Sequence, residues 1–388
     1  MIKRRYLLVL NTGQLVLPAF LFYAWPIIYG AFLPTTDQGH LTTDYQWSLI
    51  ALLLSWGVGS VISGWIFNRY GTRLGVTIGF LIAFSAYVPL TILHSDHGLI
   101  LISVLVGFSL SFLFMDPVIA RFKEVGYQAD TFNQRVIELT LFSGFASTFA
   151  YLVLTPVYSQ FSWLQANGIV IGLLIVFFVG YLQSMKGAFS PAQHASSTEV
   201  SYRELFSGTS LWMTLIFSVQ GIIQTIIFFE VFTSLNQSGP HRKYILLSFA
   251  LIGVAQVIGR IAIIARKQMT GKDMTLLSSV LMLLGVVVLY GAIHYNIYLI
   301  AIFSLLFGTG LGISTIAKPV LINETFQHQF SFYNGVYSGV LNFSRSLPPL
   351  VLGIVFVPVD QSYLLTALVV ISALMLTASY RVKVSNSG

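Results

Sequence analysis

The sequence predicts an all-α integral membrane protein with twelve transmembrane helices in two pseudo-symmetric six-helix bundles. Of its 388 residues, 56% are hydrophobic and only 9% are charged, whereas a soluble domain has about 25% charged residues. Apolar runs of about 20 residues recur along the chain, each long enough to cross a bilayer as a helix. These runs lack the strict alternation of β-barrel strands, which would be about 10 residues long.

We expect transmembrane helices, in chain order, at 6–33, 46–68, 74–94, 98–121, 134–157, 163–184, 208–236, 244–267, 275–295, 297–320, 333–357 and 361–380. The first run follows Lys3-Arg4-Arg5 and resembles a signal peptide. It is too long for a signal-peptide core and no small-residue cleavage site follows it, so we keep it as a helix. The spans leave no room for a sizeable soluble domain.

Lysine and arginine are distributed unequally over the loops. Fifteen of the 20 lie on the side of the N-terminus, two lie on the other side and three lie within spans. The positive-inside rule then places both termini in the cytoplasm, and we expect a plasma membrane of the bacterial inner-membrane type. The net charge of +7 is scattered and forms no patch, so we expect no nucleic-acid partner.

The chain divides near its middle. The longest polar break runs from Lys186 to Arg203, after six spans and before six more. We expect an N-terminal bundle, a cytoplasmic linker and a C-terminal bundle at 1–185, 186–207 and 208–388. Asp116-Pro117-Val118 at the end of span 4 is matched about 200 residues later by Lys318-Pro319-Val320 at the end of span 10, which favours duplicated halves.

The loop after span 2 carries a family motif. The run Gly64-Trp65-Ile66-Phe67-Asn68-Arg69-Tyr70-Gly71-Thr72-Arg73 resembles the signature G-x-x-x-D-R-x-G-R-R of the major facilitator superfamily. This resemblance implies a secondary transporter whose two bundles rock around a central cavity. It also implies a gating role for Asn68, Arg69 and Arg73. The family's aspartate, which latches the halves together, is replaced here by Asn68, and one arginine by Thr72, which puts a charged latch in doubt.

A second resemblance is narrower. Ala255-Gln256-Val257-Ile258-Gly259-Arg260 in span 8 and Ser143-Gly144-Phe145-Ala146-Ser147 in span 5 are similar to bacterial members near the monocarboxylate-porter branch. Span 5 lacks the glycine-proline motif of many drug–proton antiporters, which disfavours multidrug antiport.

Arg345 is the strongest candidate for binding a solute. It lies about 12 residues into span 11, roughly 18 Å from the cytoplasmic end, near the bilayer midplane. Ser338 and Asn342 share its helix face through spacings of four and three. A guanidinium binds two carboxylate oxygens at once, so this stripe favours an anionic solute. The alternative is that Arg345 pairs with an acid across the bundle and only holds helices together.

Neutral and charged candidates surround this stripe. Amides that line one face of a span are the neutral solute-binding candidates: Asn11, Gln14, Gln220 and Gln224. The candidates for gating or coupling are an ion pair between the repeat positions Asp116 and Lys318, a second cation at Arg260 and a protonatable carboxylate at Glu230. Each amide could instead be simple interhelical glue, and Glu230 an outer-rim carboxylate. Arg135 and Glu138 are expected to form a local i,i+3 pair.

We therefore expect a secondary active transporter for a small organic anion, such as a monocarboxylate. The alternatives are an efflux pump for drug-like or amphipathic compounds and a non-transporting membrane sensor. The sequence has no phosphate-binding G-x-x-x-x-G-K-[ST], G-x-S-x-G or H-E-x-x-H motif, so we expect no enzyme, cofactor or metal. The expected partners are an anionic solute, the lipid bilayer and a proton or counter-solute; we expect a monomer.

Overall fold

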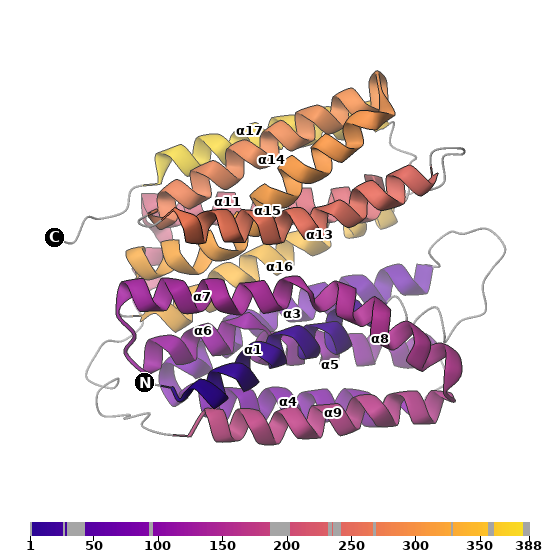
Figure 1. Ribbon diagram of the computed structural model, residues 1–388, viewed down its shortest axis with the longest axis vertical. Helices are drawn as coiled ribbons and strands as arrows, with labels where there is room; N and C mark the ends of the chain where they lie inside the picture. Colours follow the sequence, from indigo (N-terminus) through magenta and orange to yellow (C-terminus); the bar gives the residue numbers. More distant parts are fainter. Residues whose placement is uncertain are drawn as a thin grey trace. The chain divides into compact units, whose positions relative to one another are not determined.

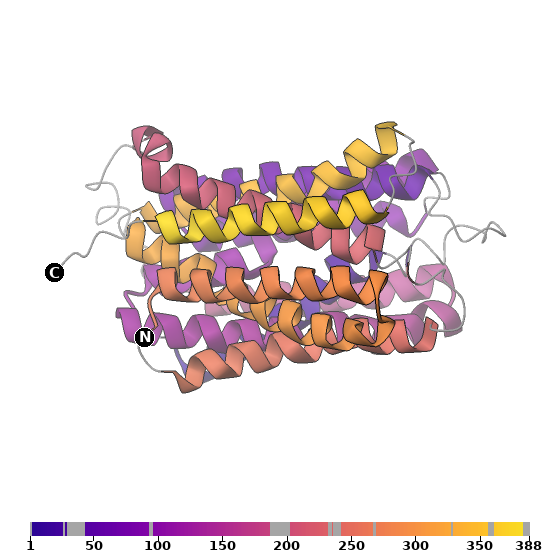
Figure 2. The same cartoon turned by 90° about the horizontal axis from the view of Figure 1, so that it is seen from above.

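The computed structural model is helical throughout the part of the chain that it describes (Figure 1). The described residues are 2–25, 28, 43–92, 96–186, 202–231, 235, 242–266, 269–326, 329–355 and 361–382. Within each of the two compact units defined below, long helices lie side by side, as a second view also shows (Figure 2).

The first six predicted spans correspond to α1 (Arg4–Pro18) with η1 (Ala19–Tyr23), α3 (Thr43–Tyr70), α4 (Thr72–Leu90), α5 (Asp96–Leu113) with α6 (Met115–Glu124), α7 (Ala129–Gly144) with α8 (Ala146–Gln160), and α9 (Trp163–Ser184). The other six correspond to α11 (Gly208–Thr225) with η3 (Ile226–Val231), α13 (Arg242–Ala265), α14 (Gly271–His294), η5 (Ile297–Leu299) with α15 (Ile300–Thr325), α16 (Phe330–Val355) and α17 (Gln361–Arg381). A short 3-10 turn, η2 (Tyr202–Phe206), precedes α11. The predicted all-α fold with twelve spans is confirmed for the described residues.

Ten of these helical stretches in the described residues are long and apolar enough to cross a membrane. The two predicted spans outside that set are 134–157 and 333–357. The first is divided at Phe145 into α7, with 16 residues, and α8, with 15. The second is α16, whose 26 residues include the polar stripe around Arg345. The break therefore leaves two short helices in span 5, and the polar stripe makes span 11 less apolar than the others.

The chain forms two compact units. One consists of Met1–Thr198 together with Gln329–Phe343, and the other of Glu199–His328 together with Ser344–Gly388. The first half of α16 therefore belongs to the same unit as α1 to α9. The division into bundles at 1–185 and 208–388 stays a prediction.

Glycines explain why the first half of α16 packs so closely on α3. A Cβ on Gly335 would lie 2.5 Å from the carbonyl oxygen of Ser60 and 2.6 Å from the Cα of Gly64. One turn later, a Cβ on Gly339 would lie 2.9 Å from the carbonyl oxygen of Gly57. Any side chain at these positions would collide with backbone. Small residues at this spacing let two membrane helices touch along their backbones.

Span 4 is broken at Phe114, and an amide from span 1 stabilises the break. Phe114 is extended, with φ −73° and ψ −172°. In an unbroken helix, the carbonyl of Leu113 would accept a hydrogen bond from the backbone N–H four residues later. That residue is Pro117, which has no N–H. Nε2 of Gln14 donates to that carbonyl at 3.0 Å and to the Tyr181 hydroxyl at 2.9 Å. Gln14 is completely buried, so its amide ties α1 to α5 and α9.

Two spans contain a π-helical turn. Span 1 continues from Pro18 into η1, and span 7 continues from α11 into η3. The Tyr87 hydroxyl of α4 donates to the carbonyl of Phe20 inside η1. A π-turn contains one residue more than an α-turn and is frequent at functional sites. These wide turns therefore distinguish spans 1 and 7 within the described residues.

Candidate functional site

Arg345 and Gln224 form a hydrogen-bonded pair between α16 and α11. Nε and Nη2 of Arg345 donate to Oε1 of Gln224 at 3.1 and 2.6 Å. Arg345 is partly buried, whereas Gln224 is buried. The Nε2 of Gln224 is also buried, and no group among the described residues accepts a hydrogen bond from it. The pair thus combines a guanidinium with an unused amide donor, and Gln224 does not neutralise the positive charge.

Ser338 and Asn342 lie on α16 two turns and one turn before Arg345, respectively. Both are buried and both belong to the unit that contains α1 to α9. Because α16 is a single helix, their spacings of four and three place them on the face of Arg345. Their role in binding a solute stays a prediction.

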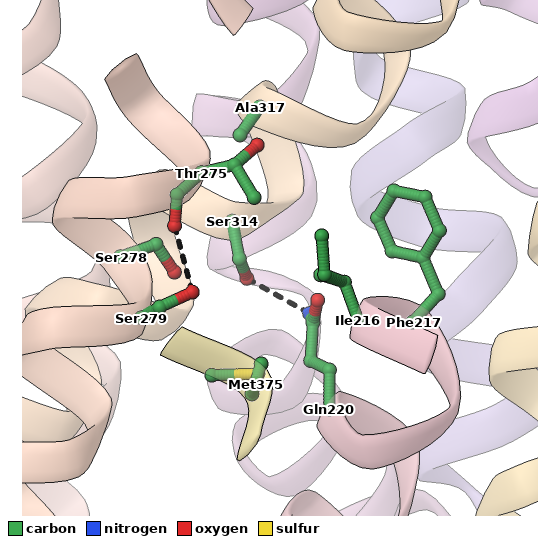
Figure 3. Close-up of a pocket in the computed structure, with 9 residues that line it drawn as sticks. All are labelled: Ile216, Phe217, Gln220, Thr275, Ser278, Ser279, Ser314, Ala317 and Met375. Atoms are coloured by element: carbon green, nitrogen blue, oxygen red, sulfur yellow. Dashed lines mark hydrogen bonds between the residues drawn. The ribbon is translucent and has the colours of Figure 1, made fainter. Parts of the chain in front are cut away.

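Gln220 lies one turn before Gln224 on α11 and faces a small cavity (Figure 3). Its Nε2 donates to the Ser314 hydroxyl of α15 at 2.9 Å. The cavity lies between α11, α14, α15 and α17 and is lined by Ile216, Phe217, Gln220, Thr275, Ser278, Ser279, Ser314, Ala317 and Met375. One amide of the predicted pair thus contacts this cavity and the other contacts Arg345.

The two amides of span 1 have different surroundings. Nε2 of Gln14 donates to the Leu113 carbonyl and to the Tyr181 hydroxyl. These hydrogen bonds hold neighbouring helices together. Asn11 is buried, and in the described part of the chain no group donates to its Oδ1. Whether either residue meets a solute stays a prediction.

The gating candidates Asp116 and Lys318 occupy equivalent places in α6 and α15. Oδ1 of Asp116 accepts a hydrogen bond from Nδ2 of Asn334, on the first half of α16, at 2.8 Å. Lys318 is partly buried in α15, one residue before Pro319. The ion pair between Asp116 and Lys318 stays a prediction.

Arg260 is 97% buried on α13, since only 3% of its surface is exposed. It donates to neutral groups: from Nε to the Thr315 hydroxyl at 3.4 Å and from Nη2 to Oε1 of Gln256 at 3.3 Å. The contact with Thr315 joins α13 to α15, whereas Gln256 lies on α13 itself. The side chain of Glu230 lies outside the described residues.

The motif after span 2 forms a tight turn that a carboxylate closes. Gly71 has φ 86°, a conformation that favours glycine, and α4 begins at Thr72. Glu124 accepts from the Thr72 backbone N–H at 2.6 Å and from its hydroxyl at 2.7 Å. Asn68 is partly buried, whereas Arg69 and Arg73 are exposed. Threonine in place of the family's arginine therefore supplies the hydroxyl that this cap uses.

The sequence analysis missed the residues around this cap. Nη1 of Arg121 lies 3.0 Å from Oε2 of Glu124, and its Nη2 donates to the carbonyl of Lys186 at 3.1 Å. The second half repeats the cap about 200 residues later, where Oε1 of Glu324 accepts from the Gly271 N–H at 2.9 Å. The sequence feature that could have predicted these caps is the glutamate that follows each of spans 4 and 10.

The predicted local pair of Arg135 and Glu138 is confirmed: Nη1 of Arg135 lies 2.5 Å from Oε2 of Glu138.

Comparison with known proteins identifies the fold. No protein-family model and no curated protein matches the sequence. The structure is similar to that of the human organic anion transporter MFSD10 (TETRAN), with TM-score 0.77 over 97% of this chain and 99% of that chain, at 13% identity. It is also similar to the proton:xylose symporter XylE of the major facilitator superfamily bound to 6-bromo-6-deoxy-D-glucose, with TM-score 0.71 over 98% and 95%, at 13% identity.

Neither structure supports the narrower resemblance to the monocarboxylate-porter branch. Both cover nearly the whole chain, so the likeness includes both halves and their order. The chain therefore has the twelve-helix fold of the major facilitator superfamily of membrane transporters.

Proposed function

We propose that the chain is a secondary active transporter that moves a small organic anion across the membrane by alternating access. The fold supports transport, because in such carriers two bundles rock around a solute site near the bilayer midplane. The sequence predicts that Arg345, on α16, lies at that depth. The names of the two similar structures, an organic anion transporter and a proton:xylose symporter, support a small-molecule solute.

The observation that carries the anion proposal is the pair of Arg345 with Gln224. An arginine within a membrane span costs about 2.5–3.5 kcal/mol on insertion scales, so its position needs a compensating role. It donates to the neutral amide of Gln224, at 2.6 and 3.1 Å. A carboxylate can therefore add a charge-assisted contact to the guanidinium, and the unused Nε2 of Gln224 is a further donor for its oxygens. Monocarboxylates are the simplest solutes of this type.

Gating and orientation complete the proposal. Asp116, Asn334 and Lys318 lie near the predicted cytoplasmic ends of their helices, where a contact that opens and closes would control access. The excess of lysine and arginine on one side supports a bacterial inner membrane with both termini in the cytoplasm. A proton or a counter-solute supplies the coupling, and the transporter acts as a monomer.

The test is uptake of radiolabelled carboxylates by proteoliposomes, combined with a thermal-shift screen of carboxylates, amino acids, sugars and drug-like compounds. A ligand that binds the folded state raises its Tm. We expect a carboxylate to raise Tm and to be transported. Arg345→Gln should abolish both effects, and Arg345→Lys should weaken them because an ammonium cannot form the planar two-point contact.

Arg381→Gln is the matched control, because Arg381 is an exposed arginine at the end of α17. It should leave binding and uptake unchanged. Stabilisation by sugars alone or by drug-like compounds alone, with Arg345→Gln equal to wild type, would contradict the anion proposal. Only stabilisation by drug-like compounds would favour the efflux pump for amphipathic compounds.

A further inference from the structure

Arg260 is buried, although its place on α13 would let it reach the end of the helix. It lies five residues before that end at Ala265, about 7.5 Å along the axis. An arginine side chain is long enough to extend to interfacial water from such a position. Instead, only 3% of its surface is exposed, and its Nη2 donates to Gln256, one turn back toward the middle of α13. The guanidinium is therefore directed into the helical unit and away from the near end of its helix.

Close packing of α13 on α15 fixes this position. A Cβ on Gly259 would lie 2.5 Å from the carbonyl oxygen of Thr309, so the two helices touch along their backbones. Next to this contact, Nε of Arg260 donates to the Thr315 hydroxyl of α15. That hydroxyl gives its own hydrogen to the carbonyl of Gly312 at 2.7 Å. The oxygen is thus oriented as an acceptor for the guanidinium.

The hydrogen bonds of Arg260 to Thr315 and Gln256 are long. They measure 3.4 and 3.3 Å, whereas well-formed N–H···O bonds measure about 2.7–3.2 Å. Both acceptors are neutral. A carboxylate forms shorter and stronger bonds to a guanidinium, at about 2.7–2.9 Å. An anion that reaches Arg260 can therefore replace two weak contacts with stronger ones.

A row of polar contacts connects Arg260 with Arg345 inside one compact unit. Nε2 of Gln220 donates at 2.9 Å to Ser314, the residue before the one that Arg260 contacts on α15 (Figure 3). One turn later on α11, Gln224 accepts from Arg345. The contacts of the two guanidiniums therefore differ in level by about one helical turn, about 6 Å along the axes.

The charges in the described part of this unit complement a dianion. Its described carboxylates lie at helix ends or in the turn η2: Glu204, Asp273 and Glu324. Arg260 and Arg345, in contrast, lie well inside α13 and α16. The described interior of the unit thus presents two cations at similar levels.

We propose that Arg260 is a second anion-binding residue of the solute site and that the solute carries two carboxylates. One carboxylate binds Arg345 and the other binds Arg260, with the amides of α11 and the hydroxyls of α15 between them. Two separate guanidiniums favour a dianion over a monoanion, because each can pair with its own charged group. This inference rests on the proposed function, which assigns Arg345 to the solute.

The first test compares ligands of the same carbon skeleton on the unmodified full chain. Calorimetric titration and thermal shift measure the binding of malonate, succinate, glutarate and adipate, and of the monomethyl ester of each. Esterification removes one negative charge and adds one methyl group. Losing a charge-assisted contact costs at least about tenfold in affinity. We therefore expect the best dicarboxylate to bind at least about tenfold more tightly than its ester.

Arg260→Gln tests the residue itself. It should reduce the affinity for the dicarboxylate to that for the monomethyl ester and leave the ester unaffected, whereas Arg345→Gln should abolish the binding of both. Arg266→Gln is the matched control, because Arg266 is an exposed arginine just after the end of the same helix. It should leave both affinities unchanged.

The ratio of the two affinities distinguishes binding from a structural role. If Arg260 only joined α13 to α15, Arg260→Gln would lower Tm without ligand and leave the ratio at its wild-type value, which would overturn the inference. Thr315→Val is the second variant, for the case that Arg260→Gln does not fold. It removes the hydroxyl that positions the guanidinium at nearly constant volume and should narrow the ratio; an unchanged ratio would again contradict the inference.

Failure of this inference differs from failure of the proposed function. If dicarboxylates and their esters bind equally and both require Arg345, the second contact is wrong and the anion transporter stands. If no carboxylate binds, or if binding does not depend on Arg345, the proposed function is wrong and the second contact with it.

Discussion

Single side chains in this protein complete backbone hydrogen bonding that the helices leave open. Gln14 donates to the carbonyl of Leu113, which Pro117 cannot serve, and Glu124 accepts from the first N–H of α4. In a membrane there is no water to take over such bonds. Polar residues that look like solute ligands in the sequence can therefore belong to the architecture.

The role of Gln14 leads to a first prediction. Gln14→Leu leaves the Leu113 carbonyl and the Tyr181 hydroxyl without their donor, so we expect a loss of about 1–3 kcal/mol in unfolding free energy. Chemical denaturation in detergent measures the loss. Gln183→Leu, at an exposed position of α9, should be neutral. A Gln14→Leu protein as stable as wild type, but with weaker solute binding, would instead assign Gln14 to the solute site.

At the scale of elements, the contact between α3 and α16 depends on the absence of side chains. Gly335 and Gly339 face Gly57, Ser60 and Gly64 at distances where a methyl group would meet backbone atoms. Backbone atoms cannot rotate away as a side chain can, so a methyl group here forces the helices apart. This contact therefore limits how closely the first half of α16 approaches α3.

Gly335→Ala should consequently lower both stability and transport. Overpacking of this kind costs typically about 1–3 kcal/mol, and we expect a corresponding drop in Tm and in the initial rate of uptake. Gly172→Ala is the matched control, because no neighbouring atom lies within 4 Å of a Cβ at Gly172. It should be neutral or stabilising, since alanine favours a helix. Equal behaviour of the two variants would contradict the close contact.

The elements also show what sequence reasoning reaches. Hydropathy located the spans, because the bilayer demands long apolar helices. It did not show the break at Phe114 or the wide turns η1 and η3, since these depend on hydrogen bonds with other helices. The contact between Arg345 and Gln224 was missed for the same reason. The sequence indicates that Gln224 is a polar residue in a span, but it does not indicate that a residue 121 positions away lies next to it.

At the scale of the whole molecule, the chain contains no cysteine, so single reporter thiols can test its orientation without a background. Tyr295, 85% exposed, lies after α14, and Phe206, 79% exposed, lies before α11. With cytoplasmic termini, a membrane-impermeant maleimide should label Tyr295→Cys in intact cells and Phe206→Cys only after permeabilisation. The reverse pattern would invert the proposed topology.

The π-turns in spans 1 and 7 change how the outer parts of these helices must be read. Each extra residue rotates everything beyond it by roughly 100°, because an α-helix has 3.6 residues per turn. A helical wheel drawn from Arg4 therefore loses its phase at Ala19, and one drawn from Gly208 loses it at Ile226. Scanning mutagenesis should therefore plot residues 19–23 and 226–231 on wheels of their own, separate from those of α1 and α11.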